Sequence, residues 1–433
     1  MRVQVNGMET SINAILREWR DLWPGGLEAG QYSTLNLMAQ CRQGTLGYNR
    51  ASCEKCRHVE WFACSCGDRH CPKCLGPRQA RWSSQVCQRL PDCAHFHLVF
   101  TLPSQIHGFF KLNYRRCGDL FFSVMSETLK QFLKNNWGME GGFFAVLHTW
   151  GRALNWHPHL HVLVGAGGMD LETGAWREES PSYLFNVFAM SMVFRAIFLR
   201  ELEALDSDPD IIWPERLDTM EARRGWRVDL AGRNWNVFSR PTVGNTRAVV
   251  RYLARYTSRI AMSNSRLTRV DPAGRTVSFK WKDYRQGGRN REMTMDGATF
   301  LRCFTRHLVP KGFTRIRYFG LLAGKKTRIA QLEGAPQESI GEKAPCEPRP
   351  ACTRCGGCEW TYQPHCETRA MTAIEGLESP LILHSGSTRH RFSLFLPAGR
   401  PEDRPADPPA GPRERPPNPR HPPNRKLSCP TRG

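Results

Sequence analysis

Apolar residues recur along this 433-residue chain with two spacings, which predict where helices and strands lie. Apolar positions three and four apart share one face of a helix, whereas strict alternation places them on one face of a strand. Helices are therefore expected over residues 11–23, 78–90, 117–137, 183–205, 245–260 and 297–308. Strands are expected over 95–102, 141–151, 159–164 and 234–240, with a hairpin formed by 276–284 and 291–297. Adjacent strands in this set favour antiparallel pairing and an α+β fold.

The pattern divides the chain into three expected regions. Residues 1–92 combine a helix with a cysteine-rich stretch of little periodicity, which is typical of a small metal-stapled module. Residues 93–330 hold most of the predicted sheet and helices. The pattern weakens in residues 331–433, where CTRCGGC (352–358) resembles a further cysteine knuckle. Residues 398–425 are so rich in Pro and Arg that they cannot bury a core, and we expect them to be disordered.

The charge of the chain indicates a polyanionic partner. The formal net charge is +21, from 61 Lys and Arg against 40 Asp and Glu. Nucleic acid is the most economical partner for such a protein. No apolar run reaches the roughly 18 residues of a spanning helix, and the first residues lack the apolar core of a secretion signal. We therefore expect a cytoplasmic, nucleoid-associated protein with no membrane contact.

Clustered cysteines predict bound zinc. Of the 17 Cys, seven lie between Cys41 and Cys74. Two CxxC pairs with fourteen residues between them are a strong zinc signal, because thiolates on tight turns can converge on one tetrahedral ion. The module could be a structural staple, could contact DNA, or could do both, and spare ligands leave room for a second ion. The zinc candidates are Cys53, Cys56, Cys66, His70, Cys71 and Cys74.

A second metal site is predicted by the sequence NWHPHLHVLVG (155–165). His159 and His161 are two residues apart in an apolar strand, so both imidazoles project to one face. Two histidines are too few for a catalytic metal, so a third ligand is required. His148 on the preceding strand is favoured, and the alternatives are His157, His95 and His97.

Two tyrosines in RYLARY (251–256) are candidate nucleophiles. Tyr252 and Tyr256 are four residues apart, which on a helix places them on one face about 6 Å apart at Cβ. Aromatic residues at this spacing often serve only as core, but this predicted helix is also strongly basic. Its arginines, which suit it to a phosphate backbone, include Arg251, Arg255 and Arg259.

With these motifs in order, the chain resembles the two-tyrosine HUH transposases of rolling-circle insertion sequences. The resemblance runs from about residue 12 to residue 323. The matching segments are DRHCPKC (68–74), HFHLVFTLP (95–103), LHTWGRALNWHPHLHVLVGAGG (147–168), YLARYTSRIAMSNSRL (252–267), KDYRQGG (282–288) and GFTRIRYFGLLA (312–323). Cys64, an additional cysteine beside Cys66, departs from the family pattern.

The resemblance implies a specific chemistry. A catalytic Mg²⁺ or Mn²⁺ would be held by His159 and His161, and structural Zn²⁺ by the N-terminal cysteines. Tyr252 and Tyr256 would attack single-stranded DNA, leaving a 5′-phosphotyrosine and a free 3′-OH. The expected fold is an antiparallel sheet with the histidine strand at its centre and the tyrosine helix against it.

Three other functions remain open from the residues themselves. A plasmid replication initiator or relaxase would use the same active-site chemistry. A non-enzymatic zinc-module regulator would explain the charge and the cysteines but not the histidine strand or the paired tyrosines. A zinc hydrolase would explain the histidines and leave the tyrosines unused.

Overall fold

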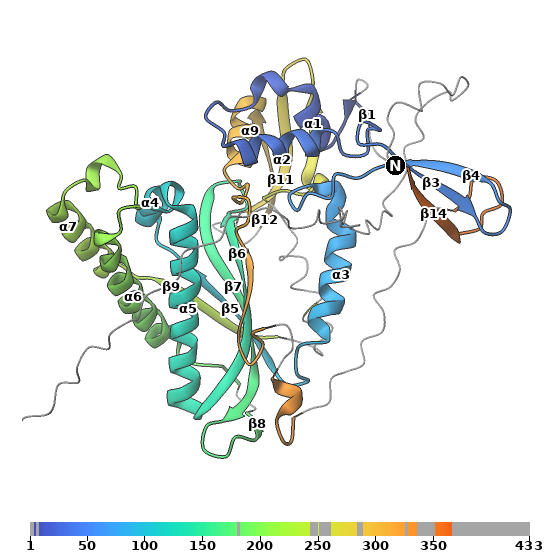
Figure 1. Cartoon of the computed structure of the whole chain (residues 1–433). Coiled ribbons are helices and arrows are strands. Elements are labelled where there is room, and N and C mark those ends of the chain that lie inside the picture. The colour runs from blue at the N-terminus through green and yellow to red at the C-terminus, as the bar shows by residue number, and fades with distance from the viewer. Residues whose placement is uncertain are drawn as a thin grey trace, which may run out of the picture. The chain divides into compact units, whose positions relative to one another are not determined.

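A central antiparallel sheet carries the histidine strand, as the computed structural model of the chain shows (Figure 1). Its strand order is β13-β6-β7-β5-β9, with β8 added to β7. These strands are β5 (His95–Thr101), β6 (Met139–Trp150), β7 (Trp156–Asp170), β8 (Trp176–Glu178), β9 (Asn236–Pro241) and β13 (Ile316–Gly320). β6, β7 and β5 are neighbours, so the histidine strand is central in the sheet.

One face of this sheet is covered by helices. Alternate residues of the central strands, such as Leu98, Leu147 and Val162, point to that face and are fully buried in the largest apolar cluster. The helices on this side are α4 (His107–Leu112), α5 (Tyr114–Trp137), α6 (Val187–Ala204) and α7 (Met220–Ala231). α5 runs along the sheet and α6 packs beside it (Figure 1).

The opposite face carries the histidines and is covered in part by α3 (Leu75–Cys87). Trp82 of α3 meets Phe144 of β6 edge-on, with ring centroids 5.6 Å apart. A smaller apolar cluster forms there, and it includes Val146, Leu163 and Val250. This face is therefore apolar toward one end of the strands and polar toward the other.

A second sheet, of order β10-β11-β12, packs with the N-terminal helices. Its strands are β10 (Leu267–Asp271), β11 (Thr276–Asp283) and β12 (Arg289–Asp296). These helices are α1 (Ile12–Glu18) and α2 (Ala29–Ala39), preceded by the short strands β1 (Gln4–Val5) and β2 (Met8–Glu9). The helix α9 (Gly297–Thr305), which follows β12, packs in the same apolar cluster. Ser11 begins α1 by accepting a hydrogen bond from the Ala14 N–H, which satisfies a free donor of the first turn.

A third sheet joins segments that are far apart in sequence. β14 (Trp360–His365) pairs with β3 (Tyr48–Cys53), which pairs with β4 (Val59–Ala63). Residues 352–365 thus fold with residues 48–63. Short 3-10 helices complete the fold at Arg20–Leu22, Pro72–Cys74, Ser104–Ile106, Leu205–Ser207, Glu215–Leu217, Asn264–Arg266 and Ile329–Gln331.

The structure describes residues 4–5, 8–179, 182–242, 250, 261–283, 289–324, 328–335 and 351–365, all within the unit Met1–Thr388. The Pro/Arg-rich residues 398–425 lie outside this set, as do Tyr252, Tyr256, Arg251, Arg255 and Arg259. Among the described residues, no helix combines the length and the apolar character needed to cross a bilayer.

The expected α+β class with antiparallel sheets is confirmed. The pairing of residues 141–151 with the histidine strand is also confirmed, since β6 and β7 are antiparallel neighbours. Several elements were not expected, among them α2, α7, β10 and β14. The helix expected from residue 183 begins at Val187, where the Asn186 side chain accepts hydrogen bonds from the first-turn N–H groups.

Gly118 of α5 lies close to the ring of Phe313, and this contact predicts how a substitution there would change stability. A methyl group at Gly118 would lie 2.5 Å from the ring of the buried Phe313, whereas one at Gly225 in α7 meets nothing within 4 Å. Gly118→Ala should lower the free energy of unfolding by about 1–2 kcal/mol, because overpacking outweighs the gain in helix propensity. Gly225→Ala should raise it by up to about 1 kcal/mol. Thermal denaturation of the two variants measures this difference, and equal melting temperatures would contradict the packing argument.

Candidate functional site

Three histidines from two adjacent strands form the candidate catalytic metal site. His159 and His161 lie on β7, and His148 lies directly opposite His159 on β6. One ring nitrogen from each histidine lies within 4.8 Å of those of the other two. His148 is buried, while the other two are half-buried. From this spacing three imidazoles can reach one ion, and the sheet register supplies the third nitrogen that the HxH motif lacks.

Hydrogen bonds orient two of these rings. Nδ1 of His159 lies 2.7 Å from the carbonyl oxygen of His157, which can only accept, so Nδ1 carries the proton. The lone pair of this neutral ring is then on Nε2. Nδ1 of His161 lies 2.9 Å from Nε2 of His97, a residue of β5. When Nδ1 of His161 carries the proton and donates that hydrogen bond, the free lone pair of the ring is on Nε2. This arrangement is typical of histidines that bind metals.

Burial keeps these imidazoles neutral. Burial lowers the pKa of His159 to about 4, and it lowers the pKa of His161 well below its ordinary value. The pKa of His97 is lowered to about 4 for the same reason. Each ring is therefore uncharged near pH 7, and protons compete with a cation only in more acidic solution. Neutral imidazoles can donate a lone pair to a cation, whereas charged histidines would instead attract an anion.

Aromatic packing fixes the third ring. Trp150 stacks on His148, with centroids 4.3 Å apart and an angle of 23° between the ring planes. The guanidinium of Arg315 lies 5.6 Å from the Trp150 ring centroid. This contact limits rotation of the imidazole about its side-chain bonds, so the ligand atom of His148 is held toward β7.

The expected nucleophiles lie outside the described residues, but Val250, two residues before Tyr252, is described. Val250 precedes Arg251 and Tyr252 directly and is fully buried. It packs in the cluster that contains Val146 and Leu163. Val146 lies opposite His161, and Leu163 is two residues beyond it, so this cluster belongs to the histidine face of the sheet.

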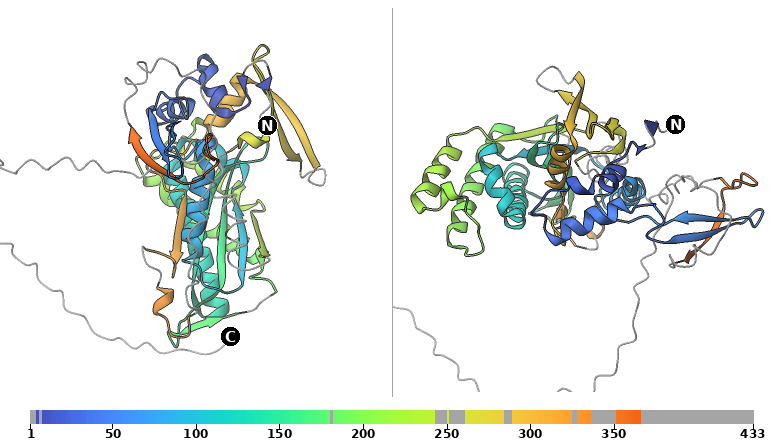
Figure 2. Two further views of the ribbon diagram at one scale, coloured as in Figure 1. Left: turned by 90° about the vertical axis from the view of Figure 1, so that its right-hand side faces the viewer. Right: turned by 90° about the horizontal axis from the view of Figure 1, so that it is seen from above.

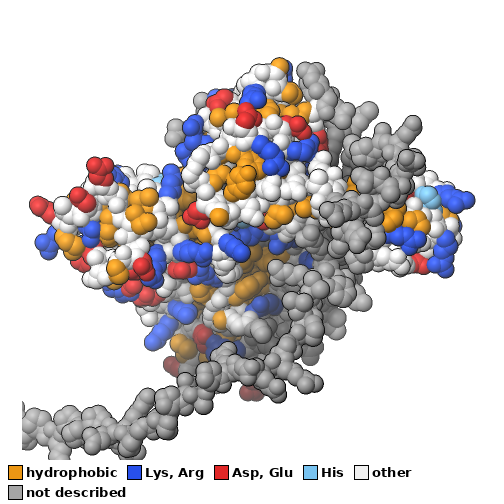
Figure 3. Space-filling model, turned by 45° about the horizontal axis from the view of Figure 1, so that its top comes forward, with side chains coloured by type: hydrophobic (Ala, Val, Ile, Leu, Met, Phe, Trp, Pro, Cys, Tyr) orange, Lys and Arg blue, Asp and Glu red, His pale blue; other side chains and the backbone are white. Residues whose placement is uncertain are grey.

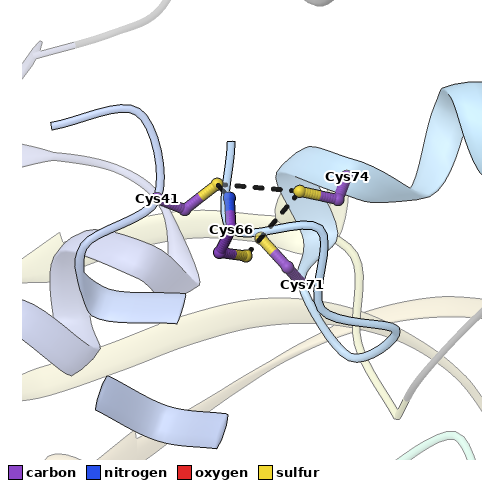
Figure 4. Close-up of side chains that lie close together, drawn as sticks. All are labelled: Cys41, Cys66, Cys71 and Cys74. Atoms are coloured by element: carbon purple, nitrogen blue, oxygen red, sulfur yellow. Dashed lines mark hydrogen bonds between the residues drawn. The ribbon is translucent and has the colours of Figure 1, made fainter. Parts of the chain in front are cut away.

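The first of two cysteine groups lies between α2 and α3. Cys41 follows α2, Cys66 follows β4, and Cys71 and Cys74 flank the turn before α3 (Figure 4). The Sγ atoms of Cys41 and Cys66 each lie 3.7 Å from that of Cys74. Thiolates bound tetrahedrally about 2.3 Å from zinc lie about 3.8 Å apart, so the four sulfurs have the spacing of a zinc site. Asn13 of α1 donates to the Cys71 sulfur at 3.2 Å.

The second group of cysteines lies at one end of the third sheet. Cys53 and Cys56 lie at the β3–β4 turn, and they meet Cys352 and Cys355 from just before β14. The Sγ atoms of Cys53 and Cys355 are 3.6 Å apart, and those of Cys56 and Cys352 are 3.7 Å apart. The backbone N–H groups of Cys56 and Lys55 lower the pKa of Cys53 to about 7, which favours the thiolate that a metal requires.

The structure thus separates the two CxxC pairs that the sequence spacing suggests could share one ion. β3 and β4 carry Cys53 and Cys56 to the turn of a hairpin, away from Cys71 and Cys74 at the start of α3. His70 belongs to neither group. Its Nδ1 lies 3.0 Å from the Asp68 carboxylate, and its Nε2 accepts from the Val309 N–H at 3.0 Å. Both ring nitrogens are engaged in fixing the loop before α3.

Three cysteines and one histidine of these sites were not assigned from sequence. Cys41 is the first of the seven clustered cysteines, and Cys352 and Cys355 lie in the separate knuckle at residues 352–358, but spacing could not show their partners. His97 was considered as a third ligand, and the structure places it behind His161 instead. Alternation in HFHLVFTL places His97 on one face of β5, but only the register with β7 shows which ring it meets.

Comparisons with known proteins agree with this architecture of cysteine groups and sheet. A family model described as "Transposase zinc-binding domain" matches residues 12–102, and one described as "Putative transposase" matches residues 142–329. The chain is 35% identical over 363 residues to "Putative transposase y4qJ" of Sinorhizobium fredii (strain NBRC 101917 / NGR234), covering 81% of this chain and 90% of that protein.

A second relative is the "Transposase for insertion sequence element IS801" of Pseudomonas savastanoi pv. phaseolicola. It is 33% identical over 308 residues, covering 70% of this chain and 72% of that protein. The chain belongs to the IS91/IS801 family of insertion-sequence transposases, with an N-terminal zinc-binding domain. The resemblance inferred from its motifs is confirmed, and a transposase acts on DNA.

The two cysteine groups predict two zinc ions per chain. Cys352→Ser with Cys355→Ser should leave one, because each group supplies its own four thiolates. Cys358→Ser is the matched control, since this exposed cysteine belongs to neither group and its loss should leave both ions. Elemental analysis of the purified proteins counts the zinc. Two ions in the double variant would show that the second group does not hold zinc.

Proposed function

We propose that this transposase cuts single-stranded ends of its insertion sequence by tyrosine attack, for rolling-circle transposition. The observation that carries the proposal is the group of three histidines on one sheet face, whose ring nitrogens all lie within 4.8 Å of one another. Such a site suits a phosphodiester bound through a divalent cation. The family motif that follows Val250 contains two tyrosines, which supply the hydroxyl groups that strand cleavage and rejoining need.

The cation would be held by His148, His159 and His161. When bound, it would withdraw charge from the scissile phosphate. Imidazole nitrogen is a better donor for a transition ion than for Mg²⁺, which prefers oxygen ligands, so Mn²⁺ is the first ion to test. His97 would act through His161 by holding the orientation of its ring.

The proposed reaction exchanges one phosphodiester bond for another and needs no external energy source. The hydroxyl oxygen of Tyr252 or Tyr256 attacks phosphorus, and the bond from phosphorus to the 3′-oxygen breaks. The tyrosine loses its proton and the departing 3′-oxygen gains one. The product is a 5′-phosphotyrosine and a free 3′-OH, and the second tyrosine serves the later strand transfer. One phosphate diester replaces another, so no ATP is consumed.

The position of Val250 supports the placement of the two tyrosines beside the histidines. Val250 is buried on the histidine face, only two residues before Tyr252. The arginines that follow, Arg251, Arg255 and Arg259, would hold the phosphates on either side of the scissile bond. The Lys and Arg side chains spread over the surface in Figure 3 suit a polyanion as well.

The nucleophile assignment is tested by phenylalanine substitution. Tyr252→Phe combined with Tyr256→Phe should abolish the covalent adduct on a single-stranded oligonucleotide from the element end, because no hydroxyl remains to attack. Tyr183→Phe is the control, since this tyrosine is 68% exposed on the loop before α6. Denaturing gels with Mn²⁺ or Mg²⁺ display the adduct. Its persistence in the double variant would refute the assignment.

The separate roles of His161 and His97 predict different responses to metal. His161→Ala should abolish nicking at any metal concentration, because a ligand is lost. His97→Ala should raise the metal concentration for half-maximal nicking by about 10–100-fold and recover activity at saturation. Titration of nicking with Mn²⁺ measures both. Failure of saturating metal to rescue His97→Ala, with its thermal stability unchanged, would make His97 a direct participant.

A further inference from the structure

The hairpin of β11 and β12 extends beyond the sheet that supports it. β10 pairs only with residues 276–279 of β11, from Thr276 to Phe279. β11 and β12 remain paired further, as far as Asp283 opposite Arg289. Residues 280–283 and 289–292 therefore form a ribbon of two strands, which projects from the molecule in Figure 2 (left, yellow). We call these eight residues the ribbon.

The ribbon is strongly basic on the surface. Lys280, Lys282, Arg289 and Arg291 are all exposed. Among the residues whose side chains the structure describes, no ion pair joins Lys280, Lys282 or Arg289 to a carboxylate, and Lys280 and Arg289 lie across the hairpin from Glu292 and Asp283. Of the two acidic residues, Glu292 accepts a hydrogen bond from the Thr268 hydroxyl at the edge of the sheet. The ribbon thus has four basic and two acidic side chains, which give it a formal net charge of +2.

The base of the hairpin is firmly packed, which makes the ribbon an ordered projection. Val277 and Phe279 are fully buried in the cluster that includes Phe300 of α9. The same cluster includes the cysteines of the first group, so the zinc-binding domain supports the hairpin. Arg266, just before the first residue of β10, adds a further contact by donating a hydrogen bond to the Lys280 carbonyl oxygen at 2.9 Å.

The binding partner must fit a projection that is narrow, ordered and basic. Two strands side by side have the width that the major groove of B-DNA admits, and lysines and arginines on them reach the phosphates on either side. A sheet edge can carry lysine merely to prevent aggregation, but that need does not require four basic residues on two paired strands. Single-stranded DNA is held more often by exposed aromatic side chains, and Trp281 is only half-exposed.

We propose that the ribbon binds duplex DNA in the major groove, as a site separate from the histidine face. It would hold the double-stranded part of an element end while the single-stranded part is cut. The proposal rests on membership of a transposase family and on the ribbon itself, and it does not depend on tyrosine attack.

The test is the combined variant Lys280→Ala, Lys282→Ala and Arg289→Ala. Three lost phosphate contacts should weaken duplex binding and reduce the slope of log affinity against log salt concentration by about 3. The control variant removes three exposed charges elsewhere, with Lys130→Ala, Lys134→Ala and Arg224→Ala on α5 and α7. Binding of full-length protein to a short duplex of several helical turns is measured by fluorescence anisotropy across a salt series.

Three outcomes are decisive. A smaller slope for the ribbon variant only, with single-stranded binding and zinc content unchanged, supports the proposal. Equal effects of the ribbon and control variants would overturn it, because the loss would then reflect net charge alone. A loss confined to single-stranded DNA would also overturn it. Since binding is the readout, failure of the tyrosine mechanism would leave this test intact.

Discussion

The register between β6 and β7 is the constraint on which the candidate site depends. It sets His148 directly opposite His159, and it sends the intervening apolar residues of both strands to the helix-covered face. A slip of one residue would exchange the two sets of side chains, leaving imidazoles in the apolar core and apolar groups on the histidine face. The burial that stabilises the sheet therefore also selects the geometry of the metal site, and His97 on β5 is positioned by the same rule.

Periodicity predicted those elements whose stability comes from a regular buried face. α5 and β5 were expected within a few residues of their observed bounds, because Phe121, Val124 and Leu129 recur at helical spacing and HFHLVFTL is followed directly by Pro103. α7 was not expected, since only Trp226 and Leu230 of its twelve residues are buried and half of its remaining positions are charged. β14 is stable only through its partner β3, more than 300 residues away along the chain, which no local pattern reveals.

The residue types of the sites were predictable, but their grouping was not. Thiols and imidazoles in clusters indicate metals from chemistry alone, and the HxH spacing sets both rings on one face. Which four sulfurs share an ion depends on long-range pairing, since a CxxC pair presents the same two thiols whichever partner it meets. His70 lies beside Cys71 in sequence, yet its nitrogens bind Asp68 and the backbone of Val309. Adjacency in sequence was a poor guide there because the loop turns the ring toward another segment.

The second cysteine group also fixes an order of events during synthesis. Cys53 and Cys355 are separated by 302 positions, so the first pair of thiols leaves the ribosome long before the second pair exists. Until translation passes Cys355, the β3–β4 hairpin has only two of its four ligands and lacks a neighbouring strand along β3. Completion of this small sheet is thus a late step, available only to chains translated nearly to their last described strand.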